Sequence, residues 1–231
     1  MGALFVTSTG TDIGKTFVSA GLIRHWRSEG RAVDALKPVM SGYDPREAAA
    51  SDAGCLLRAL GQEANEENIA RIAPWRYRAP LAPDLAAAKE NRALDVEALV
   101  GFCREQMATH DGTLLIEGVG GVMVPLDDRK TVLDWMVALA APVLLVTGSY
   151  LGTISHTLTA LTVLELARLD VRAIAVSDTA GSAVALDDTV ATLERFGHIV
   201  LNRGVPVVGI PRLASADTDH PAFAALATLL D

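Results

Sequence analysis

A short apolar segment near the start of the chain, Leu4-Phe5-Val6, leads through a Gly-Lys-Thr turn into an amphipathic segment over residues 17–29. Apolar side chains recur in that segment at helical spacing, at Val18, Leu22 and Trp26. At such a strand-to-helix turn, backbone N–H groups and the positive end of the helix converge on one point. Lys15 can reach the outer phosphates of a nucleotide there, and the Thr16 hydroxyl can ligate Mg²⁺. The turn therefore predicts a phosphate loop and a nucleoside triphosphate as its ligand.

The loop departs from the common phosphate-loop pattern. G-x-x-x-x-G-K-[ST] requires glycine at position 9, where this chain has Thr9, and Gly10 comes one residue late. A strand-to-helix turn that only happens to end in Gly-Lys-Thr is the alternative. Features elsewhere in the sequence are needed to distinguish a phosphate loop from such a turn.

Apolar segments of strand length alternate with segments of helical periodicity along the whole chain, which predicts crossover units in a mostly parallel sheet. The predicted strands are 3–8, 33–38, 113–117, 143–147, 171–176 and 205–210. Besides 17–29, the predicted helices are 51–60, 95–108, 131–140, 154–168, 187–196 and 220–230. Asp95 is the predicted N-cap of 95–108, and Thr131 that of 131–140. The chain is 50% hydrophobic but only 5% aromatic, as suits a parallel sheet covered by helices. We expect one α/β domain over residues 1–231, a three-layer fold like that of phosphate-loop NTPases.

Residues 62–92 are less regular than the rest. This segment combines three prolines with two aromatic residues, at Pro74, Trp75, Tyr77, Pro80 and Pro83. We interpret it as an excursion of loop and helix that could cover a site.

Charge and cysteine content exclude several classes of protein. A net charge of −8 argues against a nucleic-acid groove or an anionic membrane surface as partner. Cys55 and Cys103 lack the spacing of a zinc site or a disulfide framework. There is no signal peptide and no apolar segment of about 18 residues, so we expect a cytoplasmic enzyme.

Chemically reactive side chains follow several predicted strands. Lys37 follows the second strand, Glu117 and a glycine-rich segment (Gly118, Val119, Gly120, Gly121) end the third, and Ser177-Asp178 follows the fifth. Ligands of open α/β sheets bind beyond the carboxyl ends of the strands, so these groups should form one site with the phosphate loop.

Each of these residues also has a plainer explanation. Lys37 could be solvated at the strand exit, although a buried ammonium would need an anionic partner. Glu117 could cap a helix or form a salt bridge instead of binding metal. Asp52, next to Ser51 at a predicted helix start, could be an N-cap. Mg²⁺ prefers hard oxygen ligands, and Thr16, Asp52 and Glu117 would supply them. We assign no catalytic role to the histidines, including His156 near the Gly152 turn.

Taken in order, these motifs resemble those of the dethiobiotin synthetase family. The resemblance covers nearly the whole chain and rests on Val6-Thr7 to Thr16, Lys37-Pro38-Val39, Ser41-Gly42, Ser51-Asp52-Ala53, Glu117 to Gly121, Pro125-Leu126, Leu151-Gly152 with His156, and Gly209-Ile210-Pro211. The family's phosphate loop is longer by one residue, which fits the displaced Gly10.

The resemblance implies an activity and a set of site residues. The family converts 7,8-diaminopelargonate, CO₂ (or bicarbonate) and ATP into dethiobiotin, ADP and phosphate, with Mg²⁺, as a homodimer. The implied catalytic residues are Thr11, Lys15 and Lys37. The implied nucleotide-binding residues are Asp12, Ile13, Gly14, Lys15, Thr16, Phe17, Glu117, Gly118, Val119, Gly120, Ser177, Asp178, Pro211, Arg212 and Leu213. The implied substrate-binding residues are Lys37, Ser41, Leu151, Gly152 and Ser155, and in the family the partner subunit holds the substrate's tail carboxylate near the segment 150–153.

Four positions differ from the family's pattern. Ser8 stands where the family has the first loop glycine, and Gly10 where it has an acidic residue. Ser177 replaces the asparagine that commonly recognises adenine, and Ser155 replaces another near the substrate tail. A hydroxyl lacks the paired donor and acceptor of an amide, so we expect weaker discrimination among nucleotide bases.

Two other functions share this type of loop. Partitioning and positioning ATPases use it as a nucleotide-driven dimer switch, but their loop has an additional lysine near its start, and positions 8–10 here have none. Related synthetases with other substrates include those that act on corrinoid precursors, which add a glutaminase domain for which this chain has no room.

Overall fold

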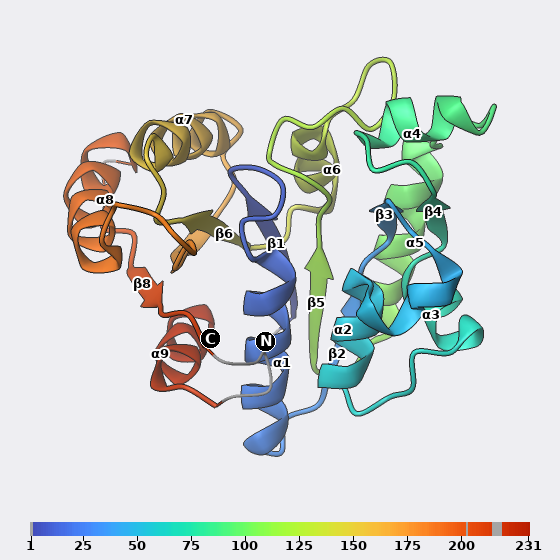
Figure 1. Ribbon diagram of the computed structural model, residues 1–231, viewed down its shortest axis with the longest axis horizontal. Helices are drawn as coiled ribbons and strands as arrows, with labels where there is room; N and C mark the ends of the chain where they lie inside the picture. The colour runs from blue at the N-terminus through green and yellow to red at the C-terminus, as the bar shows by residue number, and fades with distance from the viewer. Residues whose placement is uncertain (1, 202, 214–218) are drawn as a thin grey trace.

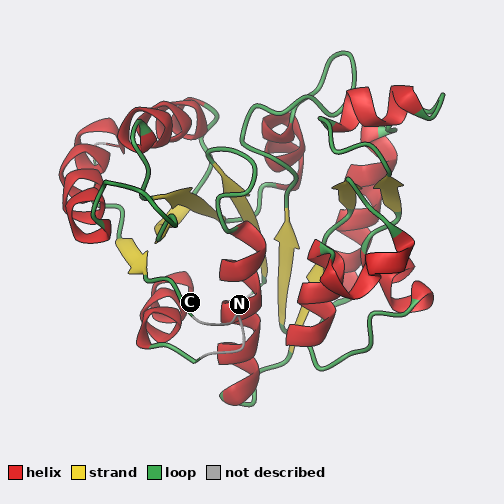
Figure 2. Cartoon of the chain, viewed as in Figure 1, coloured by secondary structure: helices red, strands yellow, loops and turns green. Residues whose placement is uncertain are grey.

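The central element of the structure is a six-stranded sheet in the order β2-β5-β1-β6-β7-β8. The computed structural model describes residues 2–201, 203–213 and 219–231. The strands are β1 Ala3–Ser8, β2 Val33–Leu36, β5 Thr113–Glu117, β6 Val143–Gly148, β7 Val171–Ser177 and β8 Val207–Ile210. Every neighbouring pair is parallel, so all six carboxyl ends lie at one edge (Figures 1 and 2).

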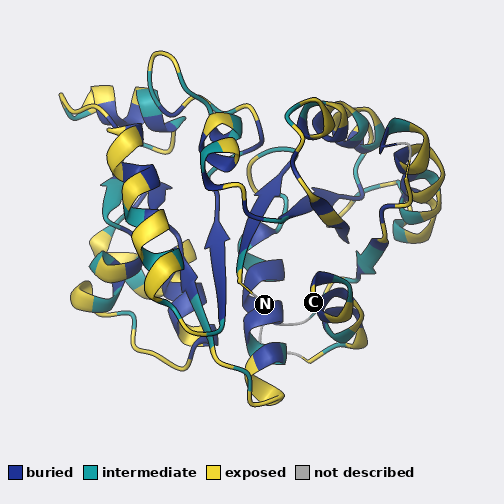
Figure 3. Ribbon diagram, turned by 180° about the vertical axis from the view of Figure 1, so that it is seen from behind, coloured by how far each residue is buried: buried dark blue, intermediate teal, exposed yellow. Residues whose placement is uncertain are grey.

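Helices cover the sheet on both faces. They are α1 Lys15–Ser28, α2 Asp52–Ala59, α3 Glu66–Ile72, α4 Pro83–Lys89, α5 Val96–Thr109, α6 Val132–Leu139, α7 Thr153–Leu166, α8 Leu186–Leu201 and α9 Pro221–Leu230, with a 3₁₀ helix at Pro45–Ala50. Helix α1 packs on β1, β2 and β5, with α2 and α9 beside it, while α7 and α8 pack together at the β6–β8 end of the sheet (Figure 1). The inner strands β1, β5 and β6 are almost entirely buried, whereas β2 and β8 at the sheet edges are partly so, and exposed residues lie mainly on the outer sides of helices and on loops (Figure 3).

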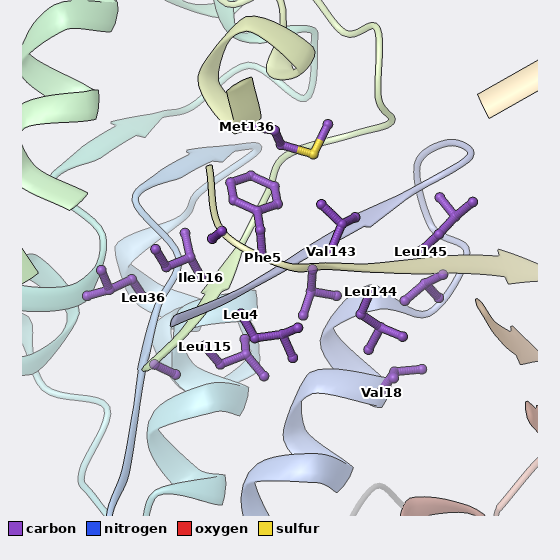
Figure 4. Packing of buried hydrophobic residues seen from close by; sticks show 14 of the residues in the cluster. Leu4, Phe5, Val18, Leu36, Leu115, Ile116, Met136, Val143, Leu144 and Leu145 are labelled. Atoms are coloured by element: carbon purple, nitrogen blue, oxygen red, sulfur yellow. The ribbon is translucent and has the colours of Figure 1, made fainter. Parts of the chain in front are cut away.

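Alternating side chains of β1 enter two different parts of the core. Phe5 points toward Met136 of α6, whereas Leu4 lies with Leu144 on the side of Val18 of α1 (Figure 4). All five of these side chains are at most 1% exposed. A sheet buried on both faces explains why its strands are continuously apolar instead of alternating.

The predicted sheet and helices are present, with differences at their ends, of which the largest is in α8, which continues to Leu201 although the prediction ended it at residue 196. Helix α1 begins two residues earlier than predicted, at Lys15, and β8 begins two residues later, at Val207. Strand β2 ends at Leu36 although the prediction continued it to residue 38. Pro38 lacks an N–H group for the strand ladder, and the chain leaves the main sheet there.

Residues 62–92 contain more regular structure than the sequence indicated. They form α3, the short strand β4 Trp75–Tyr77 and α4, and β4 pairs in parallel with β3 Val39–Ser41 in a second, two-stranded sheet. Strands of three residues give no periodic signal, so the prediction missed both. The segment does reach the site described below, as expected.

Helix caps explain several helix boundaries. The Asp95 carboxylate accepts from the Ala98 N–H at 2.9 Å, and Asp134 accepts from the N–H of Thr131 at 2.7 Å. At α2 the N-cap is Ser51, whose hydroxyl accepts from the Gly54 N–H. Asp52 is therefore not needed as a cap.

Neither cysteine forms a disulfide in the described structure; Cys103 is buried and Cys55 is partly buried. Within the described ranges, every helix is too short or too polar to cross a membrane.

Candidate active site

The phosphate loop joins β1 to α1 with an unusual backbone. Gly14 is the N-cap of α1 at φ 102°, and Asp12 also has a positive φ of 57°. A Cβ on Gly14 would lie 2.7 Å from the Ser177 Oγ, so glycine is required there both by backbone conformation and by space. The loop thus packs against the end of β7 and directs the first turn of α1 toward the cavity described below.

Lys15 folds back over the loop. Its Nζ donates to Gly120 O at 2.8 Å, to Ser8 Oγ at 3.0 Å and to Gly10 O at 3.3 Å. Burial, and next the charge of Lys37, lower the Lys15 pKa to about 8. The loop lysine is thus held among neutral oxygens.

Lys37 is buried, so the alternative of a solvated lysine at the strand exit is wrong. Its side chain is 3% exposed, and its Nζ lies 2.7 Å from Glu117 Oε1 and 2.8 Å from Asp52 Oδ2. Gly118 O accepts a third hydrogen bond at 2.9 Å. Burial acts to lower the Lys37 pKa, but the two carboxylates outweigh it and raise that pKa above its usual value. Burial likewise acts to raise the pKa of Asp52, and Lys37 outweighs it, so that this pKa is lowered.

The oxygen atoms around Thr16 fit a magnesium ion. The Thr16 hydroxyl lies 2.7 Å from Glu117 Oε1 and 2.9 Å from Asp52 Oδ1. Glu117 is fully buried, and its Oε2 has no hydrogen-bond partner in the described structure. A buried carboxylate oxygen without a partner is costly unless a cation satisfies it. In the described part of the chain no three His, Cys, Asp or Glu side chains form a metal-binding group. The candidate set is therefore two carboxylates and a hydroxyl, the chemistry that Mg²⁺ prefers alongside phosphate oxygens.

A cavity of about 740 Å³ lies beside these groups. Its lining includes the predicted site residues Thr11, Asp12, Ile13, Gly14, Lys15, Thr16, Phe17, Lys37, Ser41, Asp52, Val119 and Gly120. Residues from two distant strand ends and from the phosphate loop therefore do meet at one place. Glu117 and Gly118 lie behind the lining, where they hold Lys37.

The residues predicted for the nucleotide base lie apart from that cavity. Ser177 ends β7 next to Ile210 of β8, and Pro211, Arg212 and Leu213 follow β8 directly. Asp178 donates its N–H to Ile210 O and accepts from the Ser149 hydroxyl at 3.0 Å. This group reaches the phosphate loop from the other side, where Ser177 meets Gly14.

The remaining predicted substrate residues lie at the surface. Leu151 is 90% exposed, and Gly152 and Ser155 are also exposed, around the N-terminus of α7. They are absent from the residues that line the cavity.

A chain of hydroxyl groups connects the phosphate loop to this helix. Thr147, at the end of β6, lies 3.0 Å from the Thr9 hydroxyl and 2.9 Å from those of Thr153 and Thr157 in α7. Thr153 and Thr157 donate their own protons to carbonyl oxygens of Gly148 and Thr153. Thr147 therefore donates to one of them and is free to accept from Thr9.

Several residues that contact the site were not predicted. Tyr43 and the segment Pro80–Pro83 line the cavity, together with Met40 and Val124. The prolines of the excursion were the available signal. Ser8 departs from the family's pattern, and no sequence signal predicts its contact with Lys15.

Comparison with solved structures shows the fold. The cell division ATPase MinD of Pyrococcus furiosus aligns with a TM-score of 0.57 over 100% of this chain and 98% of its own, at 16% identity. A ParA family ATPase from Chlorobium tepidum aligns with a TM-score of 0.51 over 99% and 90%, at 13% identity. The chain has the α/β phosphate-loop NTPase fold, as predicted.

Sequence comparison is more specific. Residues 2–218 match the family described as AAA domain. ATP-dependent dethiobiotin synthetase BioD of Caulobacter sp. (strain K31) is 50% identical over 94% of this chain and 91% of its own length. The synthetases of Acidiphilium cryptum and Phenylobacterium zucineum are 47% and 44% identical, over 84% and 99% of this chain and 88% and 94% of their own. With the phosphate loop, the Lys37 cluster and these relatives in agreement, the chain belongs to the ATP-dependent dethiobiotin synthetase family.

Proposed function

We propose that this protein carboxylates 7,8-diaminopelargonate and closes its ureido ring at the expense of ATP. One amine adds to CO₂ and loses a proton, which gives a carbamate. A carbamate oxygen attacks the γ-phosphorus of ATP and releases ADP, and the second amine then attacks the carbamate carbon and expels phosphate. The observation that carries the proposal is the buried Lys37 at the wall of the cavity, next to the phosphate loop.

Lys37 supplies the positive charge that a carbamate needs. It is held by Glu117, Asp52 and Gly118 O, and its raised pKa keeps it protonated at neutral pH. A fixed cation in a buried position stabilises a developing anion without reorganisation. The negative partners also fix the direction of the Lys37 side chain.

Lys15, Thr11 and the N-terminus of α1 bind the transferring phosphoryl group in this proposal. Phosphoryl transfer requires mainly positioning and charge stabilisation. Thr16, Asp52 and Glu117 would hold Mg²⁺, which when bound neutralises charge on the phosphate oxygens. Two segments, residues 177–178 and residues 211–213, would bind the nucleotide base.

The exposed α7 terminus suits a role in a second subunit. Leu151, Gly152 and Ser155 lie outside the cavity of their own chain, but a helix N-terminus at the surface can bind a carboxylate. We propose a homodimer in which this terminus holds the substrate tail in the partner's site. A cytoplasmic location belongs to the same proposal.

ADP release from the purified protein tests this function. Mg-ATP is supplied with diaminopelargonate and bicarbonate, and each co-substrate is omitted singly. Release that requires both supports the carboxylating ligase. ADP release at the same rate without diaminopelargonate or bicarbonate would instead support a switch ATPase or a synthetase for another substrate.

A further inference from the structure

All three protons of the Lys15 ammonium have protein acceptors. Two are the backbone carbonyls of Gly10 and Gly120, and the third is the Ser8 hydroxyl at 3.0 Å. An ammonium has three donors and no more. For Lys15 to reach a phosphate oxygen, at least one of these contacts has to be released.

Ser8 is built into the base of the loop. It is fully buried as the last residue of β1, and its Oγ lies 2.5 Å from Gly10 O and 3.0 Å from Gly120 O. Its single proton serves one of these carbonyls, which leaves its lone pairs for Lys15 and, at 3.4 Å, for the Gly10 N–H. The hydroxyl therefore contacts the ammonium and both carbonyls that accept from it.

We propose that Ser8 is a positioning residue which retains the Lys15 ammonium inside the loop of the nucleotide-free protein, and so weakens binding of the nucleotide's outer phosphates. The argument rests on the proposed function, in which Lys15 contacts those phosphates. Without the hydroxyl the ammonium loses an acceptor only in the free state, because in the bound state a phosphate oxygen takes its place. Ser8 therefore stabilises the nucleotide-free state relative to the bound state, which lowers the affinity for the nucleotide.

The test is the dissociation constant of Mg-ADP, measured by titration calorimetry for the wild type and for Ser8→Ala. One hydrogen bond to an ammonium corresponds to a change of about tenfold to a hundredfold. We expect Ser8→Ala to bind Mg-ADP more tightly by that factor. In turnover assays the KM for ATP should fall by a similar factor, while kcat changes less than KM.

Ser19→Ala is the matched control. Ser19 is also fully buried, in α1, and in the described structure its hydroxyl has no hydrogen-bond partner. The same change of Ser to Ala there should leave the dissociation constant unchanged. If Ser8 acted only on stability, Ser8→Ala would shift the melting temperature and leave nucleotide affinity unchanged.

A double-mutant cycle identifies Lys15 as the group through which Ser8 acts. In a Lys15→Met background, Ser8→Ala should no longer change the dissociation constant. An equal effect with and without Lys15, or an unchanged or weakened affinity of Ser8→Ala, would overturn the proposal. If wild-type ADP release requires both co-substrates while Ser8→Ala binds like the wild type, the positioning role fails and the proposed function stands. If the wild type binds no nucleotide, both fail.

Discussion

The strand-end edge of the sheet has two halves of different chemistry. The charged half comprises Lys15 at the start of α1, Lys37 directly after β2 and Glu117 at the end of β5. The hydroxyl half comprises Thr147, Ser149 and Ser177, at the ends of β6 and β7. Each buried charge depends on a specific partner, whereas the hydroxyls share many weaker contacts. The charged half therefore suits the chemistry, and the hydroxyl half suits the placement of loops around it.

Removal of one charged partner from the charged half should cause the largest loss of unfolding free energy. Glu117→Ala leaves the buried Lys37 with one carboxylate partner, Asp52, which is 47% exposed. Loss of one member of a buried ion pair costs about 3–5 kcal/mol of unfolding free energy. Urea denaturation measures this cost. Glu97→Ala, which removes a pair with Lys130 whose Glu97 side chain is 79% exposed, is the control and should change stability by less than about 1 kcal/mol.

Replacement of the Lys37 ammonium by a neutral polar group should separate chemistry from nucleotide binding. Lys37→Gln removes the cation proposed to hold the carbamate, so turnover should fall by about a hundredfold or more. Binding of Mg-ADP should stay close to that of the wild type because Lys15 and the loop are intact. Turnover within a few-fold of the wild type would show that Lys37 does not have this role.

Stability should depend on pH through Lys15 in the charged half. The Lys15 pKa is lowered to about 8, below its usual 10.5, so the folded protein loses this proton first as pH rises. Between these two values the unfolded chain binds more protons, and unfolding free energy should increase by at most about 1.4 kcal/mol per pH unit from this group. Melting curves of metal-free protein between pH 8 and 10 test the sign. The increase should be absent from Lys15→Met, and equal slopes for both proteins would contradict the assignment.

A substitution in the hydroxyl half should change the unfolding free energy least. Thr147→Val keeps the shape of the side chain but removes the hydroxyl that joins Thr9 to α7. We expect a loss of about 1–2 kcal/mol in unfolding free energy. Thr162→Val, at an exposed position of α7 where the hydroxyl bonds only within its own helix, is the control. A loss as large as that of Glu117→Ala would remove the distinction between the two halves.

How far the sequence predicted the structure differs between these halves. Glu117 and Lys37 stand directly after apolar segments, and ligands of parallel sheets bind beyond the carboxyl ends of the strands, so the sequence predicted that the two residues share one site. The glycine-rich segment marked the approach of a ligand. Buried threonines give no comparable signal, because a hydroxyl is equally common at surfaces, caps and turns. The link from Thr9 through Thr147 to α7 depends on tertiary packing alone.

The main sheet and its helices were predictable because long apolar periods dominate them. Strands β3 and β4 were not, because three residues are too few to show a period and a pairing across more than thirty residues has no local signature. Asp52 was ambiguous for a related reason. Ser51 and Asp52 both suit an N-cap, and only the structure shows that Ser51 takes it and leaves Asp52 to contact Lys37.

The small β3–β4 sheet limits where residues can be inserted into this chain or deleted from it. The Lys37 N–H donates to Ile72 O, and the Trp75 N–H donates to Pro38 O, so the backbone on both sides of the Lys37 side chain is tied to the excursion. Deletions between residues 66 and 77 would therefore move Lys37 even though they remove no atom that touches its ammonium. Insertions and deletions should be tolerated instead at the exposed ends of the excursion, near Glu63 and Asn91.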